Sequence, residues 1–112
     1  MKIRYQIEIE QDDIPVRGNA IASGDKATDK AVEDEIIERL DSGDTWAWCS
    51  VCVVAEAGGT EGRAYLGACS YKDEADFRAG GYYEQMQKEA KEDLIAQLVR
   101  AKKTLEEIEA DQ

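Results

Sequence analysis

The sequence predicts an α+β fold, a two-layer sandwich in which a three-stranded antiparallel sheet carries two helices on one face. Three observations predict it: the N-terminal segment alternates apolar and polar residues, a glycine-containing turn separates two further strand-like segments, and two segments repeat apolar residues at helical spacing. The expected order is β-α-β-β-α with a long C-terminal helix. A chain of 112 residues is expected to form a single domain, residues 1–112.

The first strand is expected over residues 2–10, because four apolar residues alternate there with charged or amide side chains: Ile3, Tyr5, Ile7 and Ile9. The stretch 11–25 follows, with the only proline of the chain, an asparagine and glycines, and it is expected to be an ordered loop. A loop of this length in a small domain often has a functional role.

The first helix is expected from Asp25 or Lys26 to Leu40, with Val32, Ile36 and Leu40 at four-residue spacing. The second and third strands are expected over residues 45–55 and 63–71, joined by the turn EAGGTEG. A right-handed crossover from the first strand to the second would let the third strand lie between them. The stretch KDEADFRAGG, residues 72–81, predicts one or two helical turns closed by paired glycines.

The last helix is expected over residues 82–109, where apolar residues form one stripe. A helix of that length measures roughly 40 Å at about 1.5 Å per residue, which exceeds the reach of the predicted strands at about 3.3 Å per residue. The last two or three turns are therefore expected to extend beyond the sheet.

The stretch DTWAWCSVCVV, residues 44–54, does not alternate as a strand with one wet face should. Its two cysteines, Cys49 and Cys52, are expected to point to opposite faces of the sheet, and only Cys69 and no histidine could join them as ligands. The three thiols are therefore interpreted as buried and structural, with no metal site, and metal or redox function is the alternative.

The two faces of the second strand differ in side-chain size. Small and branched residues from Ala47 to Ala55 are expected to face the helices, which leaves an outward aromatic face on the other side of the sheet. An exposed aromatic patch usually marks an interface, so its residues are candidates for partner binding: Trp46, Trp48, Tyr65 and Tyr71. The alternative is that the tryptophans form the core.

Negative charge is concentrated on the predicted helices. The chain has 25 acidic and 14 basic residues and no histidine, a net charge of -11. Carboxylates four residues apart on a helix are separated by about 6 Å along its axis, comparable to successive phosphates of a nucleic acid. Two such rows are candidates for binding a basic partner: Asp25, Asp29 and Glu33, and Asp34, Glu38 and Asp41. The alternative is an ordinary solvated acidic face.

Composition argues against several other functions. Without histidine the usual general base is missing, and no nucleophile or phosphate-loop motif occurs, so no enzyme activity, catalytic residue or cofactor is expected. The negative charge disfavours direct binding to nucleic acid or to anionic membranes. No apolar stretch suits a membrane span or a signal peptide, which predicts a cytoplasmic protein.

The stretches PVRGNAIASGD, EDEIIERLDSGD, TWAWCSV, YLGACSY and FRAGGYY resemble those of small acidic proteins encoded by bacteriophages and mobile elements, over roughly residues 3–95. As a group these resemble inhibitors of host defence, of the anti-CRISPR and antirestriction type. The resemblance implies a phage-type inhibitor in the host cytoplasm whose acidic, DNA-mimicking surface binds the basic surface of a host nucleic-acid-binding protein. The alternatives are a homodimeric structural or accessory phage protein, and an enzyme with carboxylate or thiol chemistry.

Overall fold

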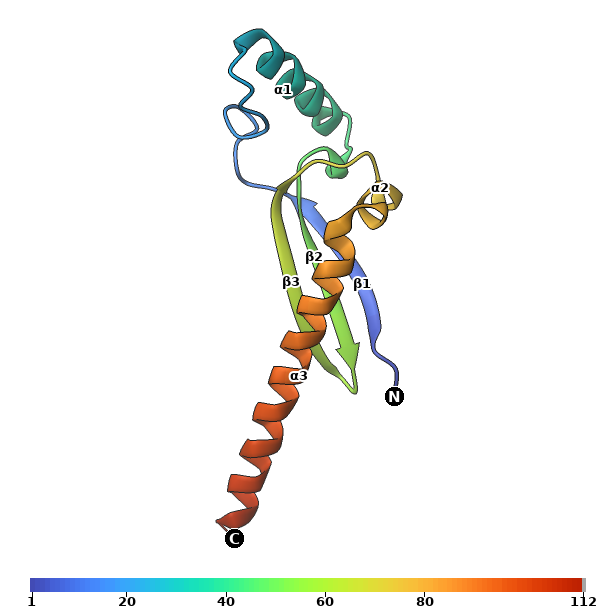
Figure 1. Cartoon of the computed structure of the whole chain (residues 1–112), viewed down its shortest axis with the longest axis vertical. Coiled ribbons are helices and arrows are strands. Elements are labelled where there is room, and N and C mark those ends of the chain that lie inside the picture. The colour runs from blue at the N-terminus through green and yellow to red at the C-terminus, as the bar shows by residue number, and fades with distance from the viewer. Residues whose placement is uncertain (112) are drawn as a thin grey trace.

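The computed structural model describes residues 1–111. Figure 1 shows a three-stranded sheet with a long helix running across it and past its end. The predicted α+β class and element order are confirmed, and the bounds of the first and last helices nearly coincide with those expected. The elements within the described residues are β1 (Arg4–Gln11), α1 (Lys26–Asp41), the 3-10 helix η1 (Thr45–Ala47), β2 (Cys49–Ala57), β3 (Thr60–Cys69), α2 (Glu74–Ala79) and α3 (Gly81–Ala110).

The strand order of the sheet is β1-β2-β3, with both neighbouring pairs antiparallel. The expectation that the third strand lies between the first two is therefore wrong. Gln11 at the end of β1 pairs with Cys49 at the start of β2, so the intervening chain leaves and returns at the same end of the sheet and makes no crossover. β2 takes the central place because its residues from Val51 to Ala55 are apolar and buried on both faces.

The predicted hairpin is confirmed, with a two-residue turn at Gly58 and Gly59. Both glycines have positive φ, 60° and 83°, as the common tight hairpin turn requires. The start of the second strand differs from the prediction, because residues 45–47 form η1. The N–H of Ala47 donates to the carbonyl of Asp44, and this turn delays the strand until Cys49.

α3 packs along one face of the sheet through Met86, Ala90 and Leu94, which lie in a buried cluster with the inward side chains of β2. The helix approaches β3 closely at Gly62. A Cβ atom there would lie 2.2 Å from the carbonyl oxygen of Ala90 and 2.3 Å from the backbone nitrogen of Leu94. The glycine therefore sets the distance between helix and sheet.

Side chains of α3 also bond to the outer edge of β3. The carboxylate of Asp93 accepts from the N–H of Arg63 at 2.9 Å, and the amide of Gln97 donates to the carbonyl of Glu61 at 2.7 Å. An unpaired strand edge is a template for aggregation, and these two contacts satisfy part of it.

The two helices on the face of the sheet are α2 and α3, since Phe77 of α2 belongs to the same buried cluster. α1 lies instead beyond the end of the sheet (Figure 1). There it forms a second buried cluster with the loop and η1: Val16, Ile36, Ala47 and Trp48. The position of α1 follows from the pairing of Gln11 with Cys49, which returns the chain to the end it left.

The loop after β1 is fastened to the far strand of the sheet by Asp12. Its carboxylate accepts from the N–H of Ala68 at 2.6 Å and from the N–H of Ile14 at 2.9 Å. These hydrogen bonds lower the pKa of Asp12 below its ordinary value, and the bond from Ala68 has the largest effect. Ala68 has a positive φ of 52°, unusual for a residue with a side chain, and the bond to Asp12 holds the strand in this conformation.

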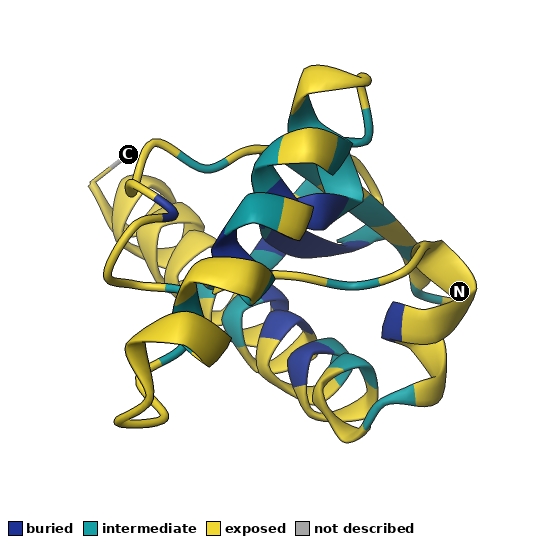
Figure 2. Cartoon of the chain, turned by 90° about the horizontal axis from the view of Figure 1, so that it is seen from above, coloured by how far each residue is buried: buried dark blue, intermediate teal, exposed yellow. Residues whose placement is uncertain are grey.

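The predicted extension of the last helix beyond the sheet is confirmed. Leu94 is the last buried residue of α3, and every residue from Leu98 to Ala110 is exposed. In Figure 2 the helix is exposed along its C-terminal part and carries buried residues only nearer the sheet. The chain is therefore elongated, with extents of 68 × 24 × 23 Å. Residues 95–110 are called the overhang below.

Candidate functional site

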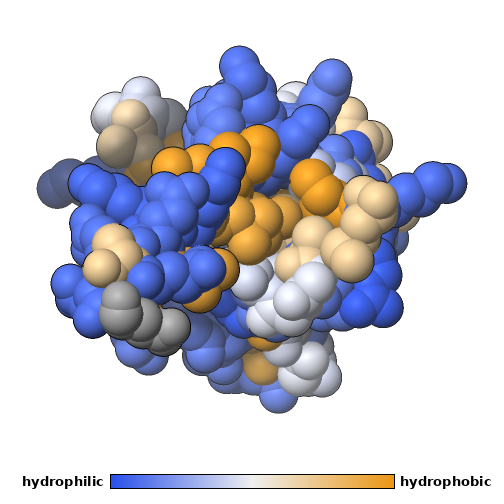
Figure 3. Space-filling view, turned by 90° about the horizontal axis from the view of Figure 1, so that it is seen from below, coloured by the Kyte–Doolittle hydropathy of each residue, from blue (hydrophilic) through white to orange (hydrophobic). Residues whose placement is uncertain are grey.

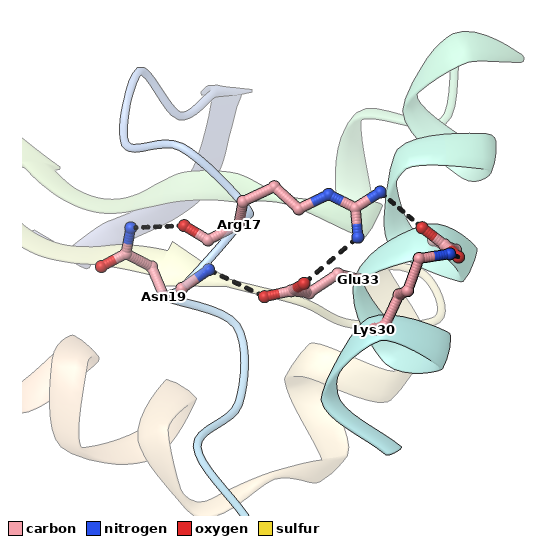
Figure 4. A network of polar contacts seen from close by, with 6 residues as sticks. Arg17, Asn19, Lys30 and Glu33 are labelled. Carbon is pink, nitrogen blue, oxygen red and sulfur yellow. Dashed lines mark hydrogen bonds and ion pairs between the residues drawn. The ribbon is translucent and has the colours of Figure 1, made fainter. Parts of the chain in front are cut away.

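The surface of α1 is the first candidate site, and most of its predicted acidic residues have structural partners. Glu33 is only 8% exposed and accepts from the guanidinium of Arg17 at 3.1 Å and from the N–H of Gly18 at 2.7 Å. Asp34 forms ion pairs with Arg17 and with Lys30. Figure 4 shows Arg17 reaching from the loop to α1, where its guanidinium bonds to the carboxylates of Glu33 and Asp34.

The N-terminal acids of α1 also hold the loop and the helix start. Asp25 is the N-cap, because its carboxylate accepts from the N–H of Ala27 and from the hydroxyl of Thr28. These hydrogen bonds, most strongly the one from Thr28, lower the pKa of Asp25. Asp29 accepts from the hydroxyl and the N–H of Ser23, at 2.6 and 3.1 Å. The row Asp25, Asp29 and Glu33 is therefore engaged within the chain.

Three exposed carboxylates of α1 make no hydrogen bond or ion pair with any described residue: Glu35, Glu38 and Asp41. Their three-residue spacing places them on one side of the helix, about 4.5 Å apart along its axis. Glu38 and Asp41 were predicted, whereas Glu35 was missed because only four-residue rows were considered. These three residues are called the free acidic row.

The predicted outward aromatic face is wrong for both tryptophans. Trp48 is 2% exposed, lies in the cluster beneath α1, and donates from Nε1 to the carbonyl of Ile14 at 2.7 Å. Trp46 lies in η1 and packs against Tyr71 and Phe77, with ring centroids 6.3 and 5.8 Å away. The turn of η1 ends the strand alternation on which the face assignment depended. Both tryptophans pack in the apolar clusters, as the alternative held, whereas the small residues of β2 face the helices, as predicted.

The two tyrosines of the predicted aromatic face are separated. Tyr71 packs edge-on against Phe77 at 5.2 Å on the helix side, and burial raises its pKa. Tyr65 is 69% exposed on the opposite side of the sheet. Its neighbours there are polar, since Arg63 bonds to Glu8 and Glu61, at 2.9 and 2.7 Å. Tyr65 therefore lies beside charges that are paired with one another.

The cysteines are buried, as predicted. Cys49 lies in the core under the helices, whereas Cys52 faces the opposite side, where its sulfur is 3.6 Å from Nη1 of Arg63. Burial raises the pKa of Cys49 and of Cys69 to about 11, so both thiols are protonated at neutral pH. A protonated, buried thiol is a poor nucleophile and a poor metal ligand.

The residues described by the structure contain no group of three or more potential ligands arranged to hold a metal ion. Within the same residues, no helix combines the length and the apolar character needed to cross a bilayer. Comparison of the chain with known protein families, with curated proteins and with solved structures found no match.

Proposed function

We propose that the chain is a non-catalytic binding protein of phage type that blocks a host defence machine, such as a CRISPR or restriction complex, by occupying its nucleic-acid-binding groove. The free acidic row carries the proposal. Glu35, Glu38 and Asp41 project from a helix at one extremity of the molecule, and no cation of the described chain neutralises them. Unpaired carboxylates on a rigid helix attract the Lys and Arg side chains that line a nucleic-acid groove.

The neighbouring contacts support this role because they fix the helix that carries the row. Arg17 ties the loop to α1, and Arg39 bonds to Asp44 and to the carbonyl of Tyr71, at 2.8 and 2.6 Å. The local cations are thus used to position α1 and are not placed beside the free carboxylates. A fixed array loses less conformational entropy on binding than mobile side chains on a loop would.

A binding role also agrees better than catalysis with the state of the candidate reactive groups. The raised pKa of Cys49 and Cys69 removes the thiolates that nucleophilic chemistry requires. The carboxylates with lowered pKa, such as Asp12 and Asp34, are held by hydrogen bonds and are poor proton acceptors.

The test is capture of host proteins from a bacterial lysate at low and high salt. We expect the wild-type chain to retain a nucleic-acid-binding protein at low salt and to lose it as salt is raised. Reversal of Glu35, Glu38 and Asp41 to Lys should abolish capture. Reversal of three exposed α3 acids, Glu84, Glu89 and Glu92, should preserve most of it, although the change in net charge is the same.

Equal losses from the two triple variants would mean that net charge alone drives the association. Capture unaffected by either variant would contradict the proposal and leave the row as a solvated surface. Both variants are expected to fold, because none of the six carboxylates bonds to another element. Circular dichroism of both variants provides the folding control.

A second candidate function, a homodimeric structural or accessory protein, is favoured by one observation. Large apolar side chains stay exposed on the overhang, among them Leu105 and Ile108 at 55% each. Exposed apolar residues at helical spacing are typical of a helix that packs against a partner.

A further inference from the structure

We propose that the free edge of β1 pairs with β1 of a second copy of this chain, the two strands running antiparallel, so that the two sheets join into one. The inference goes beyond the acidic row and uses neither α1 nor the overhang. It rests on three features of β1: an open row of backbone polar groups, the order of its charged side chains, and the half-buried apolar side chains of its inner face.

The two edges of the sheet differ in how they are covered. The outer edge of β3 is bonded in part by side chains of α3. β1 pairs with β2 without interruption from Arg4 to Gln11, and it contains no proline, glycine or bulge, which are features that commonly protect an edge strand. Within residues 1–111, no side chain or loop bonds to the backbone of Tyr5, Ile7 or Ile9. The edge of β1 is therefore open to another strand.

The backbone groups that face away from β2 belong to the odd-numbered residues of β1. The N–H of Asp12 donates to the carbonyl of Trp48, which continues the register of β1 with β2, and bonded and non-bonded pairs alternate along antiparallel strands. The even-numbered residues therefore bond to β2, whereas the N–H and C=O groups of Tyr5, Ile7 and Ile9 point outward. A second β1 can bond to this row only where odd residues lie opposite odd residues.

The charges on the outer face of β1 are ordered from basic to acidic. The side chains of alternate residues share this face, and in chain order they are Lys2, Arg4, Gln6, Glu8 and Glu10. In an antiparallel pair centred on Gln6, Arg4 lies opposite Glu8 of the second copy, and Lys2 lies opposite Glu10. This register also sets odd residues opposite odd residues.

Other arrangements of the two strands match the charges less well. A parallel pair in register would set each charge beside its own copy, and like charges directly opposite destabilise a sheet. A shift of the antiparallel pair by two residues in either direction sets Gln6 opposite a charged side chain. The charge order of β1 therefore selects a second copy, the antiparallel orientation and the register centred on Gln6.

The ion pairs already present on this face are compatible with the second copy. Arg4 bonds to Glu56 through Nε and Nη2, and Glu8 bonds to Arg63 through Oε2. The side chains of Arg4 and Glu8 remain 77% and 51% exposed, so Nη1 of Arg4 and Oε1 of Glu8 are available. Pairing of the two copies continues these contacts as one row of alternating sign across the joined sheet.

The inner face of β1 supplies the apolar part of the contact. Its side chains pack against the main cluster but stay half-buried: Ile3, Tyr5, Ile7 and Ile9. The register centred on Gln6 sets Ile3 opposite Ile9 of the second copy and Tyr5 opposite Ile7, and such pairs stabilise a sheet. Figure 3 shows apolar side chains open to solvent and bordered by hydrophilic ones at the end of the molecule where β1 begins.

The first test measures amide hydrogen exchange of the unmodified full chain by NMR over a range of protein concentrations. We expect the amides of Tyr5, Ile7 and Ile9 to exchange at least about tenfold more slowly as the concentration rises, because they gain partners in the dimer. Amides of the overhang should keep their rates. Slowing in the overhang without slowing in β1 would place the second copy elsewhere, and unchanged rates in both would mean a monomer; either result overturns the proposal.

The second test examines the charge order by sedimentation equilibrium. Lys2→Glu with Arg4→Glu makes the outer row acidic, and Glu8→Lys with Glu10→Lys makes it basic. We expect each double variant to dimerise at least about tenfold more weakly than the wild type, and an equimolar mixture of the two to restore the dimer. Dimerisation of either variant at wild-type strength, or a mixture that stays monomeric, would contradict the pairing.

The matched control is Lys102→Glu with Lys103→Glu on the overhang, which changes the net charge as much as the acidic variant and should leave the dimer unchanged. Circular dichroism checks that the variants fold, and the first test requires no substitution. No target protein is present in either test, so failure here is distinct from failure of the acidic-row proposal.

Discussion

Trp48 joins three parts of the molecule through one side chain. Its ring packs with Val16 of the loop and Ile36 of α1, and its Nε1–H donates a hydrogen bond to the carbonyl of Ile14. A large aromatic side chain whose polar atom is also paired contributes both apolar burial and a satisfied hydrogen bond. The placement of α1, and therefore of the free acidic row, depends on this residue.

Replacing Trp48 with Ala should lower the free energy of unfolding by about 3–5 kcal/mol, because it leaves a cavity in a small cluster. Trp48→Phe should cost less, since only part of the ring and the bond to Ile14 are lost. Tyr65→Ala is the control and should change stability by less than about 0.5 kcal/mol, because Tyr65 is exposed. Urea denaturation measures all three; wild-type stability of Trp48→Ala would contradict the buried position.

Single residues also explain which site predictions failed. The engagement of Asp25 could be anticipated, because aspartate directly before a helix is a common N-cap. The pairing of Asp34 with Lys30 follows from their four-residue spacing. The contacts of Arg17 with Glu33 and Asp34 could not be anticipated, because they depend on how a distant loop folds over α1.

At the scale of elements, the approach of α3 to β3 is fixed by backbone contact at Gly62. Neighbouring residues of α3 bond to the same strand through Asp93 and Gln97. Helix and strand are therefore joined by a close approach and by polar contacts on either side of it. A change at Gly62 must move the helix, because the atoms it meets belong to the backbone.

Gly62→Ala should destabilise the protein by at least about 1–3 kcal/mol, the usual cost of overpacking. Gly67→Ala in the same strand is the matched control, since its Cβ would meet only the Asp12 carboxylate at 3.4 Å. Thermal unfolding of the two variants provides the comparison. Similar melting temperatures would show that α3 can shift away from β3 without cost.

Elements were predictable from sequence where periodicity is long and uninterrupted. The stripe of α3 and the alternation of β1 gave nearly correct bounds, because both patterns extend over many residues. Strand order was not predictable, because it depends on where the segment 12–48 returns to the sheet. The prediction of which sheet face the tryptophans occupy was wrong for a local reason. The 3-10 helix η1 replaces the strand before Cys49, so the alternation of side chains does not extend to Trp46 and Trp48.

The molecule contains two separate apolar clusters, and different elements form each of them. One lies between the sheet and helices α2 and α3, and the other lies beneath α1. The proposed target surface is at the α1 end, and the overhang is at the opposite end (Figure 1). A partner bound to the overhang would therefore leave the free acidic row accessible.

The pairing of Gln11 with Cys49 has a kinetic consequence. Bringing β1 to β2 closes a loop of residues 12–48, whereas β2 meets β3 across two glycines. With a cost of about 0.6 kcal/mol for each doubling of loop length, the entropic difference amounts to roughly 2–3 kcal/mol. We expect β1 to dock last during folding and to detach first by local opening. Native-state hydrogen exchange of the monomer should then be faster for amides shared by β1 and β2 than for those shared by β2 and β3, and uniform protection would mean that the sheet opens as one unit.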